Sequence, residues 1–182
     1  MKDSDIVCSL LPAPFHGMVG DLCINNGVNM VTASYVSPAV RELEQRCLDA
    51  GLCILNEVGL DPGMDHMSAM KIMDDVKERG GTIKHFSSVC GGLPAPEAAT
   101  NPLMYKFSWS PMGVMTASQN SAVFLKDGEV VEVEGGELLN SAEDLHAFPT
   151  MNLECLPNRD SLMYRDLYDI EKADTVFRGT IR

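Results

Sequence analysis

Several widespread signatures are missing from this sequence of 182 residues. It has no G-x-G-x-x-G, no P-loop and no G-x-S-x-G, so a complete dinucleotide-binding loop, a P-loop site and a serine-hydrolase nucleophile are not indicated. No two cysteines are spaced C-x-x-C, which argues against a zinc site, and we expect no bound metal. Several cysteines lie in apolar runs, so we expect reduced thiols at all six positions: Cys8, Cys23, Cys47, Cys53, Cys90 and Cys155.

Basic residues are also scarce. Lysine and arginine number 14 against 26 acidic residues, which gives a formal net charge of -12. An acidic surface repels phosphate backbones, so we expect no nucleic-acid partner. The first apolar run, residues 6–11, is too short for a secretory signal or a membrane span, so we expect no membrane partner. An anionic substrate would need a local arginine cluster, which Arg159, Arg178 and Arg182 could supply.

What is present fits packed α/β domains, with 45% hydrophobic and 22% charged residues. Apolar runs at 5–11, 29–32 and 52–55 alternate with helical patterns at 15–26 and 37–51. The second helical pattern opens with a serine N-cap followed by proline. The strands are apolar throughout, as expected when both faces of a sheet are covered. Residues 1–60 are therefore predicted to form part of a Rossmann-type, doubly wound parallel sheet.

The pattern changes near residue 60, and residues 61–182 are predicted to form an incomplete α+β substrate-binding and dimerisation domain. Its expected elements are a helix at 64–79, a strand at 82–89, a long loop at 91–111, a helix at 112–125 and a strand at 129–133. The single tryptophan, Trp109, is expected in a core or at an interface between lobes.

Ligands of open parallel sheets bind beyond the carboxyl ends of the strands, which here are followed by residues 12–16, 33–35 and 56–61. Ser34 and Tyr35 could offer hydroxyls to a ligand there, or bond only to the local backbone. Asp61 could be an ordinary turn residue or a carboxylate directed at a substrate amine. Together with Asp65 and His66 it could form a metal site, but no fourth ligand is evident.

Two further motifs have a structural and a functional interpretation. The glycines after Cys90 permit either a turn or the close approach of a ligand to the backbone. Arg159 and Arg182 could bind carboxylates bidentately, or be solvated surface arginines.

Longer stretches of the chain are far more specific than these motifs. They are 56–66 (NEVGLDPGMDH), 90–97 (CGGLPAPE), 101–110 (NPLMYKFSWS), 157–161 (PNRDS) and 178–182 (RGTIR). In order and spacing they resemble the saccharopine dehydrogenases, glutamate-forming oxidoreductases of lysine metabolism. That family also supplies the C-terminal half of alpha-aminoadipic semialdehyde synthase. The resemblance runs over nearly the whole chain.

The resemblance implies a Rossmann domain with a substrate and dimerisation domain inserted in it. The chain would begin within the second half of the Rossmann sheet, so the glycine-rich dinucleotide loop would precede Met1, and it would stop inside the substrate domain. We therefore expect a fragment that binds the cofactor weakly by itself, taken from an enzyme that is a homodimer. A cytoplasmic location is expected, or a mitochondrial one if the chain is part of a bifunctional enzyme.

The implied reaction oxidises saccharopine with NADP or NAD and hydrolyses the imine to glutamate and 2-aminoadipate 6-semialdehyde. The sequence leaves the choice between NADP and NAD open. The resemblance implies catalytic positions at Asp61 and Tyr35. It implies substrate-binding positions at Ser34, Tyr35, Asp61, Cys90, Gly91, Arg159, Thr180, Ile181 and Arg182. It implies cofactor-lining positions at Ala33, Ser34, Leu60, Asp61, Pro62 and Ser110.

Two alternatives stay open. One is a related reductive-condensation enzyme acting on a polyamine, such as carboxynorspermidine or homospermidine synthesis; the stretches at 90–97 and 101–110 argue against it. The other is a non-catalytic remnant that acts as an assembly module, which the missing glycine-rich loop favours for the isolated chain. Titration of the purified chain with cofactor separates a remnant from an enzyme.

Overall fold

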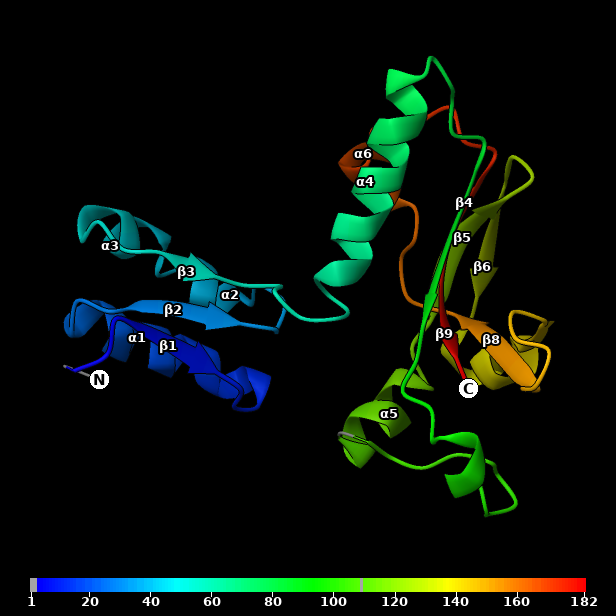
Figure 1. The fold of residues 1–182 in the computed structure, drawn as a ribbon, viewed down its shortest axis with the longest axis horizontal. Coiled ribbons are helices and arrows are strands. Elements are labelled where there is room, and N and C mark those ends of the chain that lie inside the picture. Colours follow the sequence, from blue (N-terminus) through cyan, green and yellow to red (C-terminus); the bar gives the residue numbers. More distant parts are fainter. Residues whose placement is uncertain (1–2, 109) are drawn as a thin grey trace. The chain divides into compact units, whose positions relative to one another are not determined.

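The structure is a computed structural model that describes residues 3–108 and 110–182 (Figure 1). The chain divides into two compact units, Met1–Ile72 and Met73–Arg182, and the division falls within a long helix, α4 (Met64–Glu78). Each unit is described by itself. The predicted role of Trp109 lies outside the described residues. None of the helices described is long and apolar enough to cross a membrane.

The first unit contains a parallel sheet of three short strands. They are β1 (Ile6–Ser9), β2 (Asn29–Thr32) and β3 (Ile54–Leu55), in the spatial order β1-β2-β3. A single 3₁₀ turn, η1 (Ala13–Phe15), and α1 (His16–Asn25) connect β1 to β2. Two short helices, α2 (Pro38–Arg41) and α3 (Glu44–Asp49), connect β2 to β3. The three predicted parallel strands are therefore confirmed.

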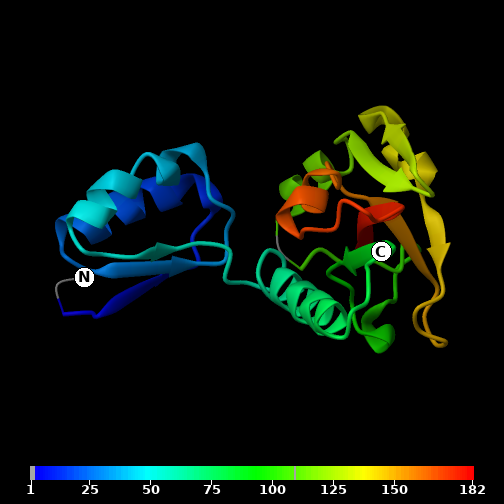
Figure 2. The same cartoon turned by 90° about the horizontal axis from the view of Figure 1, so that it is seen from above.

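The helices of this unit cover one face of its sheet (Figure 2). Both connections join neighbouring strands in the same direction, and the right-handed crossover rule then puts both sets of helices on the same side. Val19, Cys23 and Met30 form the buried core on that side. Ile6 and Leu55 are 56% and 53% exposed. The prediction that both faces are covered is therefore wrong for these residues.

The predicted helix at 37–51 is interrupted at residues 42–43. Its start is as expected, because the Ser37 hydroxyl accepts a hydrogen bond from the Val40 N–H at 3.3 Å. At the interruption Leu43 turns inward and packs against α1, with its Cδ1 2.8 Å from the position of a Cβ added to Gly20. Packing against a neighbouring helix therefore overrides the single helix that the local pattern predicts.

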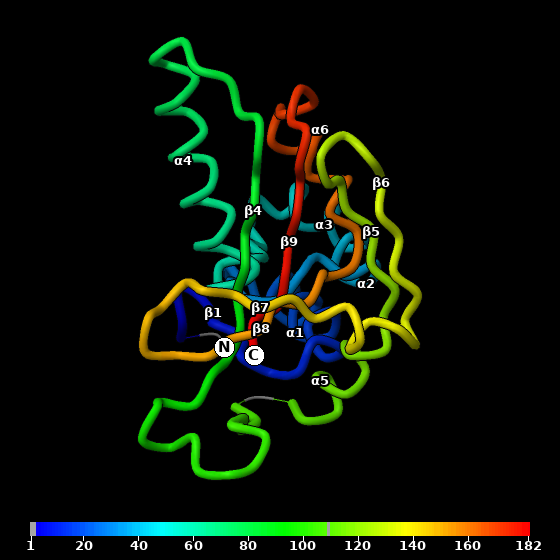
Figure 3. The backbone as a smooth tube through the Cα atoms, turned by 90° about the vertical axis from the view of Figure 1, so that its right-hand side faces the viewer, coloured from blue at the N-terminus to red at the C-terminus, as the bar shows by residue number. Residues whose placement is uncertain are grey.

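The second unit is built on a six-stranded mixed sheet. Its strands are β4 (His85–Cys90), β5 (Ala122–Lys126), β6 (Glu129–Val133), β7 (Glu143–Leu145), β8 (Leu153–Pro157) and β9 (Thr175–Ile181). β9 is central. It lies parallel to β4 along its whole length, as Figures 1 and 3 both show, and antiparallel to β5 and β8. The other elements are α5 (Pro111–Ala117), α6 (Met163–Leu167), and the 3₁₀ helices η2 (Pro96–Ala98) and η3 (Gly135–Ser141).

The predicted helix at 112–125 is wrong beyond α5, because residues 122–126 form the strand β5. Asp127 and Gly128 both have positive φ, at 51° and 86°, which suits the two-residue turn of a β-hairpin. β5 pairs with β6 across this turn. The prediction treated Lys126-Asp127-Gly128 as the stop signal of a helix and missed its meaning as a hairpin turn.

Candidate active site

A tight turn, residues 59–63, follows β3. The Gly59 N–H bonds to the Pro62 carbonyl at 2.9 Å, and the Met64 N–H bonds to the Gly59 carbonyl at 2.9 Å. Gly63 has a φ of 147°, and a Cβ there would collide with the Gly59 carbonyl oxygen. Asp65 closes the turn, because its Oδ1 accepts the Gly63 N–H at 2.8 Å. The close packing of this turn therefore leaves no room for a side chain at Gly59 or Gly63. The chain continues from the turn directly into α4.

The end of β2 lies against this turn. A Cβ on Gly59 would be 2.9 Å from the Ala33 side chain, so the two backbones approach closely there. The Ser34 carbonyl accepts the Glu57 N–H at 3.1 Å. Tyr35 extends across the edge, and its hydroxyl donates to Asp61 Oδ1 at 3.2 Å. The first unit thus brings together six of the predicted site residues: Ala33, Ser34, Tyr35, Leu60, Asp61 and Pro62.

These six residues differ in how much of their surface is exposed. Leu60 is 65% and Tyr35 52% exposed, whereas Pro62 is buried. Ser34 and Asp61 are half-buried, so each presents part of its side chain at the edge. Pro62 lies within the turn, which contains a cis peptide bond between Asp61 and Pro62.

A buried histidine, which no local sequence pattern distinguishes, lies beneath the same edge. His16 is 1% exposed and is the first residue of α1. Its Nδ1 is 3.0 Å from Ser9 Oγ, and its Nε2 is 2.8 Å from Ser34 Oγ and 3.2 Å from Thr32 Oγ1. The available signal was the position of residues 12–16 after a strand, because polar groups there face the ends of neighbouring strands.

Asp65 and His66, considered above for a metal site, contact each other at the start of α4. His66 Nε2 lies 3.7 Å from Asp65 Oδ2. Among the residues that the structure describes, no group of three or more His, Cys, Asp or Glu could hold a metal ion. Asp65 instead accepts a backbone N–H at the start of α4.

In the second unit the ends of β4 and β9 bring another predicted set together (Figure 3). Cys90 pairs with Thr180 across the parallel strands. Gly91 lies so close to β9 that a Cβ on it would collide with the Ile181 carbonyl oxygen. Arg182 follows directly, and its Nε donates to Glu154 Oε2 at 2.8 Å. Within the described part of the chain, the two Nη atoms of Arg182 make no hydrogen bond, so this edge of the guanidinium can take a carboxylate.

Ser110 also lies in the second unit, at the start of α5. It caps α5, because its Oγ accepts the Gly113 N–H at 3.1 Å. Two residues earlier, Ser108 lies against Gly92, with its Oγ 2.6 Å from the position of a Cβ on that glycine. The loop before α5 therefore passes beside the end of β4.

Arg159 and Arg178 do not join Arg182 as a cluster. Arg178 is 6% exposed, lies over the Tyr164 ring at 4.5 Å and donates to the Tyr164 hydroxyl. It is a core residue, so its predicted contribution to a surface arginine cluster is wrong. Arg159 is exposed, with a φ of 50°. The antiparallel register of β8 and β9 puts Arg159 opposite residue 177, about five residues along β9 from Arg182, roughly 17 Å at the rise of a strand.

The cysteines separate into two environments. None of the six, each of which the structure describes, forms a disulfide. Burial raises the pKa of the Cys23 and Cys47 thiols, and raises the pKa of Cys155 to about 11. These three are packing residues. Cys8 and Cys53 are exposed, and Cys90 is half-buried at the end of β4.

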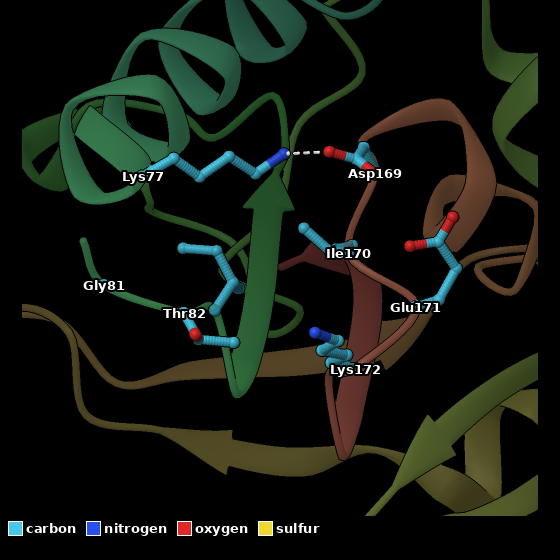
Figure 4. Close-up of a pocket in the computed structure, with 8 residues that line it drawn as sticks. Lys77, Gly81, Thr82, Asp169, Ile170, Glu171 and Lys172 are labelled. Carbon is cyan, nitrogen blue, oxygen red and sulfur yellow. Dashed lines mark hydrogen bonds and ion pairs between the residues drawn. The ribbon is translucent and has the colours of Figure 1, made fainter. Parts of the chain in front are cut away.

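A cleft of about 190 Å³ lies elsewhere in the second unit, between the end of α4 and residues 169–172 (Figure 4). Lys77 donates to Asp169 at 2.9 Å and to the Tyr168 carbonyl at 3.2 Å. The hydrogen bond and the positive charge of Lys77 lower the pKa of Asp169. The cleft contains none of the predicted site residues, and its ion pair fastens α4 to the loop before β9.

Comparison with known proteins identifies the family of the chain. Residues 59–182 match the family described as Saccharopine dehydrogenase C-terminal domain, and residues 1–55 match Saccharopine dehydrogenase NADP binding domain. The whole chain is 51% identical to part of Alpha-aminoadipic semialdehyde synthase, mitochondrial, of Mus musculus, covering 20% of that protein. It is 48% identical to Saccharopine dehydrogenase [NADP(+), L-glutamate-forming] of Saccharomyces cerevisiae, covering 41% of it.

A solved structure gives the same result at the level of the fold. Apo saccharopine dehydrogenase (L-Glu forming) from Saccharomyces cerevisiae superposes with a TM-score of 0.92 and 49% identity, over 100% of this chain and 41% of that one. The chain thus spans between about a fifth and two fifths of the length of these relatives. Because a family model covers most of its residues, the chain belongs to the saccharopine dehydrogenase family.

Proposed function

We propose that this chain contains part of the active site of an NADP-dependent saccharopine dehydrogenase of the glutamate-forming type. The observation that carries the proposal is the match over the whole chain, at 48% identity, to a yeast protein named for that activity. The geometry supports it, because the predicted site residues gather at the carboxyl edge of one sheet and at the ends of β4 and β9 in the other. We assign residues 1–60 to the nucleotide-binding domain and 61–182 to the substrate domain.

The edge formed by the ends of β2 and β3 suits the nicotinamide end of a dinucleotide. Ala33, Ser34, Leu60 and Pro62 offer backbone, a hydroxyl and apolar surface without a cationic group. Residues 3–63 contain two basic side chains, Arg41 and Arg46, and Arg46 is bonded to Asp21. The phosphates of the cofactor therefore have no cationic partner at this edge. NADP is favoured over NAD because the matching family and the yeast relative are described with NADP.

The arginines would bind the carboxylates of the substrate. Saccharopine carries three carboxylates, and in a chain of net charge -12 it needs local cations. Arg182 is held through Nε by Glu154, with the opposite edge of its guanidinium directed away from that bond. Arg159 lies roughly 17 Å along the sheet and suits another end of a long, multiply charged substrate. The surface between the two arginines would be lined by Thr180, Ile181, Cys90 and Gly91.

The reaction requires little covalent chemistry from the protein itself. When bound, NADP⁺ would supply the acceptor for the hydride that leaves the aminoadipate CH₂ group next to the substrate nitrogen. Water then adds to the imine of the substrate, and cleavage of the C–N bond releases glutamate and the semialdehyde. Asp61, oriented by the Tyr35 hydroxyl, would hold the proton of the secondary amine or order the attacking water. Ser34 would contact substrate and cofactor at the same edge.

The assembly and compartment follow as part of the same proposal. We propose that the intact enzyme is a homodimer and acts in the cytoplasm, where thiols stay reduced. If the chain is part of a bifunctional enzyme like the mouse relative, whose name specifies mitochondria, the location would be mitochondrial.

A chimera tests the proposal. Residues 3–182 replace the matching segment of the yeast saccharopine dehydrogenase, which they cover at 48% identity. The expected result is NADPH and glutamate formed in equal amounts from saccharopine and NADP⁺. A folded chimera that binds cofactor but turns over only a carboxylated polyamine would favour the polyamine alternative. A folded chimera without activity would favour the non-catalytic alternative.

A further inference from the structure

Glu57 lies between β3 and the turn at 59–63, and the reaction described above gives it no task. It is half-buried, and its backbone φ is 61°, in the left-handed region that glycine favours. A residue with a side chain is strained in that region, so its presence there points to a requirement of the surrounding structure. The hydrogen bonds around Glu57 show what that requirement is.

The left-handed backbone turns two successive N–H groups toward the segment after β2. The Glu57 N–H donates to the Ser34 carbonyl at 3.1 Å, and the Val58 N–H donates to the Thr32 carbonyl at 3.2 Å. In an extended strand successive N–H groups point to opposite sides, so a straight continuation of β3 could not make both bonds. Glycine would meet this backbone requirement with less strain. The backbone bonds therefore explain the turn, but not why its residue is a glutamate.

The glutamate side chain adds a third hydrogen bond. Glu57 Oε1 accepts the Val36 N–H at 3.2 Å. The Ser34 carbonyl belongs to the peptide group before Tyr35, and the Val36 N–H belongs to the peptide group after it. Glu57 therefore binds both peptide groups that flank Tyr35, one through its backbone and one through its carboxylate. Because each peptide group is planar, fixing both of them restrains φ and ψ of the residue between them.

Packing restrains Tyr35 little, because this residue is 52% exposed. Its hydroxyl nevertheless reaches Asp61 Oδ1 at 3.2 Å. We propose that Glu57 is a positioning residue that holds the backbone of Tyr35 so that the hydroxyl meets Asp61. The effect on turnover rests on the proposed function, in which Tyr35 orients Asp61. The contact of Glu57 with the flanking peptide groups is independent of that function.

Hydrogen exchange of the Val36 amide tests this contact in the 182-residue chain, without turnover. In a spectrum of ¹⁵N-valine-labelled chain, Val36→Ile identifies the signal by its loss. We expect similar exchange rates in the parent and in Glu57→Gln, because glutamine keeps an acceptor at the same reach. In Glu57→Gly the amide should exchange at least about tenfold faster. Equal exchange in the parent and in Glu57→Gly overturns the proposal.

Kinetics in the active chimera test the action on Tyr35. Glu57→Gly relieves the backbone strain and keeps the N–H, so it removes the carboxylate alone. We expect it to lower kcat about fivefold, with an unchanged urea midpoint, whereas Glu57→Gln stays within about twofold of the parent. With Tyr35→Phe already present, Glu57→Gly should cost less than about twofold more. If Glu57→Gly does not fold, Glu57→Asn replaces it, because asparagine tolerates a positive φ and is one methylene shorter.

Asp127→Gly is the matched control. Asp127 also has a positive φ, 51°, but it lies in the hairpin between β5 and β6, so its replacement relieves similar strain and should leave kcat unchanged. Three kinetic results overturn the proposal: no loss with Glu57→Gly, an equal loss with Gln and Gly, or a loss with Gly that persists undiminished in the Tyr35→Phe background. A parent chimera without activity counts against the proposed function instead, and exchange of the Val36 amide then decides the contact by itself.

Discussion

The hydroxyl of Tyr35 donates to Oδ1 of Asp61 at 3.2 Å and so ties the segment after β2 to the turn after β3. The two residues are 26 positions apart in the sequence. They meet because parallel strands end at the same edge of a sheet and because Gly59 lets the turn lie against Ala33.

Tyr35→Phe removes this hydrogen bond and keeps the ring. Because Tyr35 is 52% exposed, we expect the free energy of unfolding to change by less than about 1 kcal/mol. In the chimera kcat should fall about tenfold, because Asp61 loses its orientation toward the amine. Steady-state kinetics measure the change in kcat, and urea denaturation of the same preparation measures the change in the free energy of unfolding. An unchanged kcat, or a loss that simply follows a loss of stability, would count against the pair as catalytic.

Gly63→Ala should strongly destabilise the first unit. A Cβ at this position collides with the Gly59 carbonyl oxygen, and its φ of 147° is strained for alanine. We expect the unfolding free energy to fall by about 3 kcal/mol or more, measured by urea denaturation. Gly136→Ala is the control, since a Cβ there meets nothing within 4 Å and should be nearly neutral. A cost below about 1 kcal/mol at Gly63 would show that the turn can rearrange.

Thiol labelling reports the cysteine environments. In the native chain at pH 8 we expect rapid alkylation of the exposed Cys8 and Cys53 and slow alkylation of the buried Cys23, Cys47 and Cys155. The raised pKa of Cys155, about 11, leaves about one thiol in a thousand ionised at pH 8, and the ionised fraction grows as pH rises toward 11. Mass spectrometry after timed alkylation makes the measurement. Denatured, non-reduced chain should give six free thiols, and a consistent deficit of two would reveal a disulfide.

Local patterns were sufficient to predict most of the secondary structure. The three parallel strands, α4 and β6 were predictable because apolar runs, a serine cap and glycine stops act over a few residues. The strand β5 was missed because its sequence also fits a helix and because Asp127-Gly128 was interpreted as a helix stop, although Asp-Gly also favours a two-residue hairpin turn. The single covered face of the first sheet depends on crossover handedness rather than on the composition of any strand.

The grouping of the candidate site residues was predictable in outline, but the side chains that support them were not. Residues following the strands could be named because sheet edges collect ligands. Nothing local distinguishes Arg178, buried against Tyr164, from Arg182, which is exposed at the strand end. His16 was missed for a similar reason, because its three partners come from separate segments that only the sheet brings together.

The chain alone should bind NADPH weakly. The edge offers contacts to the nicotinamide end but no glycine-rich loop for the pyrophosphate. Fluorescence titration of the purified chain should show no saturation in the micromolar range. The chimera, in which the yeast segment supplies that loop, is the control and should bind. Micromolar binding by the chain alone would mean that it holds the phosphates in a way that the structure does not suggest.

The most direct measurement of the substrate assignment is the kinetics of Arg159→Ala and Arg182→Ala in the chimera, with Arg79→Ala as control. Arg79 is an exposed arginine that pairs with Asp75 in α4, so its loss should leave the kinetics unchanged. A charge-assisted hydrogen bond contributes about 1.5–3 kcal/mol, so each site variant should lower kcat/KM for saccharopine about 10- to 100-fold. Lysine at either position should recover only part, because it lacks the bidentate fork. The prediction is this loss with an unchanged KM for the cofactor; near-normal saccharopine kinetics in both alanine variants would contradict it and make both arginines ordinary surface residues.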